Sequence, residues 1–500
     1  MSTYEEEYTG PADLELQDVE PPPIEPPEEP SIEPRSATIV VKAGTRAPDI
    51  QAVLDRAAQG DVIKFEQGSY EGQFLISRPG LSLTGQGATF IHPSTGWEGC
   101  FRITAQATLL DGMTIKPKPG NHVYGLISVG WSETVDAAMQ PRYVTLKNLK
   151  LRGDPQKGAQ RAIMFEAGTD CRIQNCDIDD IFAGVDAQCI WSSNGIGGWV
   201  IENCKMRASG QAILIGGTKS NIQGYTIRNI VIKNNAFRGR MGAGMLSKYI
   251  LEFKRGENIS ITDNYLSDFT GGVNAGSAIG LTVRLERNRN PWVVIKNIYI
   301  ARNRFWNVGR MINALGRDDN SNFGGKFEGL TVYDNLAIMG GPAPNYGIQL
   351  LAGIENIEIG KNTIVNAGTT GQLASSIYVE SPPTGLPVAG YVAKYPIKNM
   401  QVAGNVLGGP MVGRGCAGQN ALNAYTRGST VASNVFLAPH KMGGNQTANR
   451  ALVLDKNYAV KNPYTAHGSD LYVGTGVGVL LESDGKQEPP EEGLMSGLSE

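Results

Sequence analysis

The stretch that decides the fold is NIVIKNNAF, residues 229–237, together with ISITDNYL at 259–266 and IYIARNRF at 298–305. All three share one frame, apolar-x-apolar-x-x-Asn-x-apolar. Alternating apolar residues predict a half-buried strand, and the Asn that follows predicts a sharp turn. The frame returns in LTVYDNLA (330–337), IEIGKNTI (357–364), MQVAGNVL (400–407), STVASNVF (429–436) and LVLDKNYA (452–459).

The position of the Asn in this frame marks a repeat along the chain. It is occupied by Asn235, Asn264, Asn303, Asn335, Asn362, Asn405, Asn434 and Asn457. Upstream, the same position holds Leu149, Cys176 and Cys204, so the steps from Leu149 to Asn457 average about 31 residues. The steps differ in length while the frame stays intact, which is typical of stacked coils with variable loops.

A second kind of strand follows each frame and completes a coil. Examples are AIMFEAG (162–168), AILIGG (212–217), YILEFKRG (249–256), SAIGLTV (277–283), YGIQLLAG (346–353) and SSIYVES (375–381). One coil cannot cover its own apolar face, but stacked coils bury a continuous core. An Asn in every coil then lies about 4.8 Å from the next, so its amide can hydrogen-bond along the stack. Asn also tolerates the left-handed backbone that a sharp turn needs.

Helical periodicity is detectable only from Ala47 to Gln59. There Asp49 is the expected N-cap, Gly60 ends the helix, and one face is apolar through Ile50, Val53 and Leu54.

With this frame, the chain resembles the right-handed parallel β-helix of the pectate-lyase-like superfamily over roughly residues 38–480. The opening segment, IVVKAGTRAPDIQAVLDRAAQGDVIKFEQGSYEG (39–72), is similar to that superfamily's N-terminal cap, in which a short helix covers the end of the core. The resemblance implies an all-β solenoid of about a dozen coils with an Asn ladder. It does not fix the function, since the superfamily includes polysaccharide lyases, glycoside hydrolases, epimerases and phage tailspikes.

Charge divides the chain into a basic body between two acidic ends. Residues 1–34 hold eleven acidic residues, eight prolines and no Lys or Arg, and residues 482–500 hold six acidic residues and one basic. Removing these from the totals of 48 acidic and 45 basic residues leaves 31 and 44, a net charge of +13. We therefore expect a disordered acidic arm at 1–36, a cap at 37–70, a β-helix at 71–481 and a disordered acidic tail at 482–500.

Several classes of protein are excluded by the sequence. Gly accounts for 63 of 500 residues, which disfavours a helical bundle. The six cysteines form no CxxC pair and the four histidines are scattered, so we expect buried free thiols, no metal site and no cofactor. No 18-residue apolar run, secretory signal, phosphate-binding loop or nucleic-acid motif occurs.

Acidic pairs are the first candidates for chemistry. Asp179-Asp180 follows a frame Cys and is expected at a turn, while Asp318-Asp319 lies in the Gly-rich insertion GRDDNSNFGG (316–325), a better candidate for a site loop. For both acidic pairs, the alternative interpretation is a solvated loop without a chemical role. Polygalacturonase-type runs (NTD, GHG, RIK) are absent.

A charged row is the second candidate. Aligning the second strands on their terminal glycines stacks Glu166 on Lys254, with Glu252 two positions earlier on the same face and Arg284 in the next coil. Such a row suits acid–base work or a charged sugar, although a salt-bridged exterior row is the simpler interpretation.

A basic cluster is the third candidate. Arg284, Arg287 and Arg289 could bind an anionic glycan or an acidic subunit, with Trp292 and Trp306 stacking on sugar rings or merely packing.

Two functions follow from these features. The preferred interpretation is a structural or recognition protein, a phage virion component such as a tailspike-like or capsid-decorating protein. It would be made in the cytoplasm and would dock through residues 1–34 onto other virion subunits. The resemblance implies a homotrimer. The alternative is a polysaccharide lyase or glycoside hydrolase with its site on the coils between 160 and 320.

Overall fold

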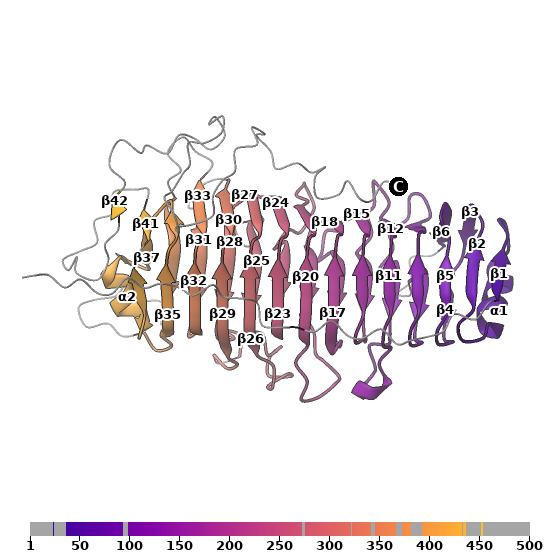
Figure 1. The fold of residues 1–500 in the computed structure, drawn as a ribbon, viewed down its shortest axis with the longest axis horizontal. Coiled ribbons are helices and arrows are strands. Elements are labelled where there is room, and N and C mark those ends of the chain that lie inside the picture. Colours follow the sequence, from indigo (N-terminus) through magenta and orange to yellow (C-terminus); the bar gives the residue numbers. More distant parts are fainter. Residues whose placement is uncertain are drawn as a thin grey trace, which may run out of the picture.

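The computed structural model describes residues 24, 37–93, 99–272, 276–321, 323–341, 346–366, 373–381, 393–432, 434–436 and 452–453. Over this range three long sheets wind into a right-handed parallel β-helix whose coils follow one another along the long axis (Figure 1), which confirms the predicted fold class. Asn457, the tail and the whole of the arm other than Ile24 lie outside the described residues.

Sheet A is formed by the alternating apolar residues that precede the Asn of each frame. Its strands are β1 (Thr38–Val41), β2 (Val62–Phe65), β5 (Ser82–Thr84), β8 (Leu109–Asp111), β11 (Thr145–Lys147), β14 (Arg172–Gln174), β17 (Gly197–Glu202), β20 (Arg228–Lys233), β23 (Gly256–Thr262), β26 (Ile295–Ala301), β29 (Phe327–Tyr333), β32 (Glu355–Gly360), β35 (Ile397–Ala403), β39 (Thr426–Arg427) and β40 (Thr430–Ala432).

Sheet B receives the residues that follow the frame Asn. Its strands are β3 (Gly68–Glu71), β6 (Ala88–His92), β9 (Thr114–Pro117), β12 (Lys150–Arg152), β15 (Asp177–Ile181), β18 (Lys205–Ala208), β21 (Ala236–Gly239), β24 (Tyr265–Phe269), β27 (Arg304–Val308), β30 (Leu336–Met339), β33 (Thr363–Asn366), β36 (Val406–Leu407), β41 (Val435–Phe436) and β42 (Leu452–Val453).

Sheet C contains the second strands recognised in the sequence. Its strands are β4 (Phe74–Ile76), β7 (Phe101–Ile103), β10 (Ile127–Val129), β13 (Arg161–Phe165), β16 (Gln188–Ser192), β19 (Gln211–Ile215), β22 (Leu251–Phe253), β25 (Ser277–Thr282), β28 (Arg310–Leu315), β31 (Tyr346–Leu351), β34 (Ser375–Glu380), β37 (Met411–Gly413) and β38 (Cys416–Ala417). Named strands pair in parallel throughout the described chain, except that β37 and β38 are antiparallel.

The Asn ladder lies in the turn between sheets A and B. Asn303 is fully buried, and its Nδ2 donates to the carbonyls of Ile261 (2.8 Å) and Ala301 (3.1 Å) and to Asn335 Oδ1 (3.0 Å). Its own Oδ1 accepts from Asn264 of the preceding coil. The same contacts recur from Asn235 to Asn434, so each amide satisfies backbone groups that the sheets leave unpaired.

The left-handed residue of this turn is not the ladder Asn, which corrects our expectation. It is the residue immediately before, for example Asn234, Asp263 and Asp334, with φ of 56°, 59° and 55°. The ladder Asn is then free to point its side chain into the stack.

Two cysteines continue the ladder toward the N-terminal end. The backbone N–H of Cys204 donates to Asn235 Oδ1 at 2.9 Å, and the N–H of Cys176 donates to Cys204 Sγ at 3.3 Å. Both thiols are buried and free, and burial raises the pKa of Cys204 well above its ordinary value. Their Sγ atoms also donate to backbone carbonyls, Cys176 to Gln174 and Cys204 to Glu202, so the buried thiols take the donor place of the ladder Asn.

The helix α1 (Ala47–Arg56) lies at the β1 end of the solenoid (Figure 1). It buries Ile50 and Leu54, as predicted, but ends earlier than expected. Arg46 occupies the N-cap position and pairs with Asp49 at 3.0 Å, so Asp49 is not the N-cap. The side chain of Gln51 donates to and accepts from the backbone of Leu75, which satisfies the free edge of β4.

A second helix, α2 (Gln419–Tyr425), packs near β37 toward the other end, and a short 3-10 helix, η1, spans Ala137–Met139. The sequence analysis missed α2 because seven residues are too few to show a helical period. No helix among the described residues has the length and apolar character needed to cross a membrane.

Candidate functional site on the outer face of sheet C

One row of side chains runs along the outer face of sheet C. The paired positions from β7 to β34, which we call the outer row, are Arg102, Ser128, Met164, Trp191, Leu214, Glu252, Gly280, Asn313, Gln349 and Tyr378. Met164, Trp191 and Leu214 pack together with Tyr124 in a cluster separate from the main core. The row therefore faces away from the core, with an apolar centre and polar residues on both sides.

A chain of side-chain hydrogen bonds crosses four coils on this face. Arg161 Nε donates to Gln188 Oε1 (2.9 Å), Gln188 Nε2 to Gln211 Oε1 (3.0 Å), and Gln211 Nε2 to Glu252 Oε2 (2.6 Å). All four side chains belong to buried residues. Because each amide has both a donor and an acceptor partner, the chain fixes the orientation of the Glu252 carboxylate.

Glu252 is a buried acid with few countercharges. Burial raises the pKa of its carboxyl, and this effect outweighs the opposing attraction of Lys254, whose Nζ lies 3.8 Å from Oε1, and the Gln211 hydrogen bond. A carboxylate with a raised pKa is a stronger base and exchanges protons closer to neutral pH. Glu252 is therefore suited to proton transfer.

Tyr249, which the sequence analysis missed, lies beside Glu252. Its hydroxyl accepts a hydrogen bond from Asn313 Nδ2 at 2.8 Å, so the phenolic proton remains available to another acceptor. Burial and then the charge of Glu252 raise the pKa of Tyr249 to about 12, which keeps the phenol protonated at neutral pH. A Cβ at Gly280 would lie 2.6 Å from the Tyr249 ring, so only glycine lets the ring cross this coil to Asn313.

Arg310, on β28, supplies positive charge and has no carboxylate partner among the residues that the structure describes. Burial lowers its pKa, and the groups that oppose this are the phenols of Tyr249, Tyr346 and Tyr378. Its guanidinium lies 5.2 Å from the centre of the Tyr346 ring. Arg310 is the feature of this face that best fits a carboxylate ligand.

Unpartnered buried polar atoms gather on the same face. Among the described residues, five such atoms belong to it: Arg102 Nε, Ser128 Oγ, Arg161 Nη1, Arg310 Nε and Asn313 Oδ1. Buried polar atoms without partners are uncommon, so this face has unused capacity to hydrogen-bond a polar ligand.

Glu166 was expected to stack on Lys254, but the two are three coils apart. The register Phe165, Ser192, Ile215, Phe253 places both at the same height on the strands, separated by about 14 Å along the stack. Burial raises the pKa of Glu166, against the opposing charge of Arg102. The predicted alignment gave Glu166 and Lys254 the correct height on their strands, but it wrongly placed them on neighbouring coils.

Asp318 and Asp319 fix a loop. Arg284 Nη1 pairs with Asp318 at 2.9 Å and with Asp319. Asp318 also accepts hydrogen bonds from the N–H groups of Leu285 (2.7 Å) and Asn320 (3.0 Å). Burial acts to raise the pKa of Asp318, but these hydrogen bonds outweigh it and the pKa falls below its ordinary value. An acid held ionised in this way is a poor proton donor.

The predicted basic and aromatic residues do not gather in one patch. Arg287 and Arg289 are exposed on the loop after β25. Trp292 packs against the core, and its Nε1 donates to the carbonyl of Tyr225 at 3.0 Å. Trp306 is half-buried on β27 of sheet B, away from the outer row of sheet C.

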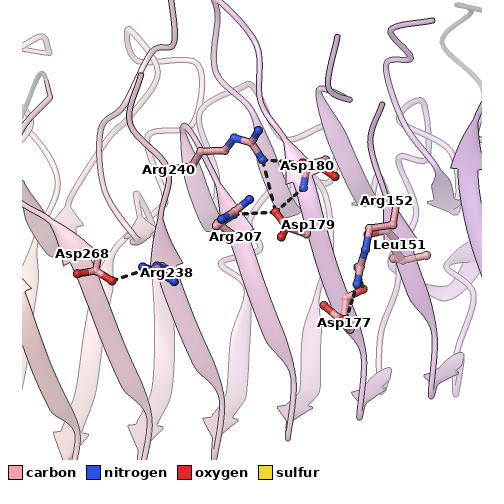
Figure 2. A network of polar contacts seen from close by, with 9 residues as sticks. All are labelled: Leu151, Arg152, Asp177, Asp179, Asp180, Arg207, Arg238, Arg240 and Asp268. Carbon is pink, nitrogen blue, oxygen red and sulfur yellow. Dashed lines mark hydrogen bonds and ion pairs between the residues drawn. The ribbon is translucent and has the colours of Figure 1, made fainter. Parts of the chain in front are cut away.

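The Asp179-Asp180 pair on β15 forms ion pairs with neighbouring coils (Figure 2). Arg207 Nε lies 2.8 Å from Asp179, and Arg240 Nη1 lies 2.7 Å from Asp180. Arg240 also covers the ring of Phe182 at 4.2 Å. Both carboxylates are thus neutralised by arginine.

Metal ligands do not cluster in the part of the chain that the structure describes. No three His, Cys, Asp or Glu side chains there lie close enough together to hold an ion.

Comparisons with known proteins identify the fold. The sequence matches no family model, and no curated protein matches it. Among solved structures, a mannuronic acid-specific polysaccharide family 6 lyase from human gut microbiota gives a TM-score of 0.53 at 12% identity, covering 81% of this chain and 89% of that one. The family 6 alginate lyase AlyGC gives 0.51 at 12% identity, covering 83% of this chain and 53% of that one. At such low identity these likenesses show the parallel β-helix fold alone.

Proposed function

We propose that the protein is a lyase that cleaves a polysaccharide containing uronic acids, with its site on the outer face of sheet C. The observation that carries the proposal is that buried Glu252 lies beside Tyr249, and Tyr249 beside Arg310, which has no carboxylate partner in the described part of the chain. The fold is compatible with this reaction, since the two solved structures above are lyases. These findings favour the enzymatic alternative, and none favours the virion interpretation.

The substrate class follows from the charges of the site. Arg310 and Lys254 present positive charge, and the stacked rings of Tyr346 and Tyr378, with centroids 5.0 Å apart, continue the face toward β34. A guanidinium binds a carboxylate more strongly than it binds a neutral hydroxyl. A sugar that carries a carboxylate therefore fits this face better than a neutral sugar.

The chemistry of elimination assigns a role to each residue. A proton leaves the carbon next to the sugar carboxylate, the bond to the leaving oxygen breaks as a carbon–carbon double bond forms, and the leaving oxygen takes up a proton. Glu252, with its raised pKa, accepts the first proton, and Tyr249 donates the second. Arg310 stabilises the negative charge that builds on the carboxylate.

Hydrolysis fits the site less well because it requires two free carboxyl groups across the scissile bond. The negative charge of Asp186 acts to raise the pKa of Glu252, but Asp186 itself pairs with Lys248 at 2.8 Å. Asp318 is held by Arg284. Asp186 and Asp318 therefore each have a closer cationic partner than Glu252, whose Lys254 lies 3.8 Å away.

The test is incubation with alginate, polygalacturonate and glycosaminoglycans, with release of unsaturated oligosaccharides followed by ultraviolet absorbance. We expect product from at least one of these and none from a neutral glucan. Reducing ends without unsaturation would replace the lyase by a hydrolase. No product from any acidic polysaccharide would contradict the proposal.

Docking through residues 1–34, the homotrimer and the site of synthesis remain predictions from the sequence.

A further inference from the structure

A loop beside sheet C presents an aromatic ring that the folded core does not use. Trp131 is 43% exposed, although its neighbour in space, Arg102, covers the ring with its guanidinium at 3.9 Å from the centre. Packing therefore accounts for one face of the indole and leaves the rest open. A large aromatic that is exposed next to a cation is suited to bind a sugar ring by stacking.

A carboxyl group and a hydroxyl group also lie near Trp131 and Arg102. The backbone N–H of Ser132 donates to the buried carboxyl of Glu166, on which the charges of Arg102 and of a second acid, Glu133, also act. Ser128 is fully buried one coil from Arg102, and neither its Oγ nor Arg102 Nε has a hydrogen-bond partner among the described residues. Polar atoms able to orient a sugar thus surround the indole.

The loop that carries Trp131 is fixed in place. Asn194, 3% exposed, donates from Nδ2 to the carbonyl of Thr134 at 2.6 Å, and Asn221 Nδ2 donates to the carbonyl of Ser132 at 2.6 Å. Gln140, at the end of the loop, donates to the carbonyl of Asn194 at 2.7 Å. A loop held at three points presents its aromatic ring in one orientation, which lowers the entropic cost of binding.

We propose that Trp131, Arg102 and Glu166 form a second subsite that binds another sugar unit of the same polysaccharide through its ring face and hydroxyl groups. Arg102 and Glu252 lie on the outer row five coils apart, or about 24 Å. The subsite therefore contributes to binding only for polysaccharide chains long enough to contact both Glu252 and Trp131. This inference rests on the proposed function and adds to it a preference for long substrates.

The experiment measures calorimetric binding of uronate oligosaccharides to the full chain carrying Glu252→Gln, which prevents turnover. Trp131→Ala in that background should weaken binding of chains longer than 24 Å by about tenfold and leave a disaccharide unaffected. Trp131→Phe should restore part of the loss. Val135→Ser is the matched control, because Val135 is 70% exposed on the same loop, and it should change nothing.

The outcomes separate the two proposals. Equal affinity of the parent and Trp131→Ala for long chains overturns the subsite while the proposed function stands. An equal loss in Trp131→Ala and Val135→Ser also overturns it, since the whole loop would then be responsible. No binding of any uronate chain by the parent overturns the proposed function and the subsite together.

Discussion

Sheets B and C carry similar charged residues on neighbouring coils but use them differently. On sheet B, Arg238 pairs with Asp268 at 3.0 Å with side chains 51% and 33% exposed (Figure 2). On sheet C, the Glu252 side chain is 6% exposed, and none of the described carboxylates pairs with Arg310. Exposed pairs satisfy each other and contribute little stability, whereas buried groups without full partners keep capacity for a ligand. Pairing, more than charge itself, distinguishes the structural face from the candidate site.

The largest effect is expected from removing the proton-transfer groups of sheet C. Glu252→Gln and Tyr249→Phe should each lower kcat/KM on the cleaved polysaccharide by roughly 10²–10⁴-fold, because each removes one proton transfer. At neutral pH, Glu252→Gln should be at least as stable as wild type because it removes a buried charge. Tyr249→Phe should cost roughly 1–3 kcal/mol because Asn313 Nδ2 loses its acceptor. Rates near wild type in both variants would remove Glu252 and Tyr249 from the mechanism.

The next largest effect is a loss of stability on removing one side chain of the Asn ladder. Asn303→Ala leaves the buried carbonyls of Ile261 and Ala301 without their donor and interrupts the ladder between two coils. We expect a loss of about 3 kcal/mol in the free energy of unfolding, since each orphaned buried group costs roughly 1–3 kcal/mol. Urea denaturation measures this loss. A change below about 0.5 kcal/mol would show that the ladder is not needed for stability.

The pH dependence of stability tests the burial of Glu252. Its folded pKa is raised above the unfolded value of about 4.3, so its contribution is fully present below that pH and is lost as pH rises through the folded pKa. Wild type should therefore lose stability relative to Glu252→Gln from about pH 4.3 upward, by about 1.4 kcal/mol for each unit of pKa shift. Parallel stability curves for the two proteins contradict a raised pKa.

The smallest effect is expected on sheet B. Arg207→Ala breaks its pair with Asp179, whose side chains are 37% and 32% exposed, and should cost at most about 1 kcal/mol. Polysaccharide cleavage should remain at the wild-type rate. A large loss of activity in this variant would mean that the site had been placed on the wrong face.

The sequence could predict the fold well and the site only in part. The frame around Asn235 to Asn434 fixes strands, turns and ladder together because one local pattern serves every coil. Glu252 and Lys254 could be placed on the right face because alternation along a strand decides it. Tyr249 and Asn313 could not be joined, since their contact depends on the bare Gly280 between two coils. The pairing of Glu166 with Lys254 was wrong because aligning the terminal glycines skipped two intervening strands, β16, which was not recognised, and β19, which was.

The most direct test of the central claim is a crystal structure of Glu252→Gln with a bound uronate oligosaccharide. We expect sugar on the outer face of sheet C, with a carboxylate on Arg310 and a ring beside Tyr249 and Tyr346. Sugar bound on sheet A or on the ion-paired face of sheet B, with sheet C bare, would contradict it.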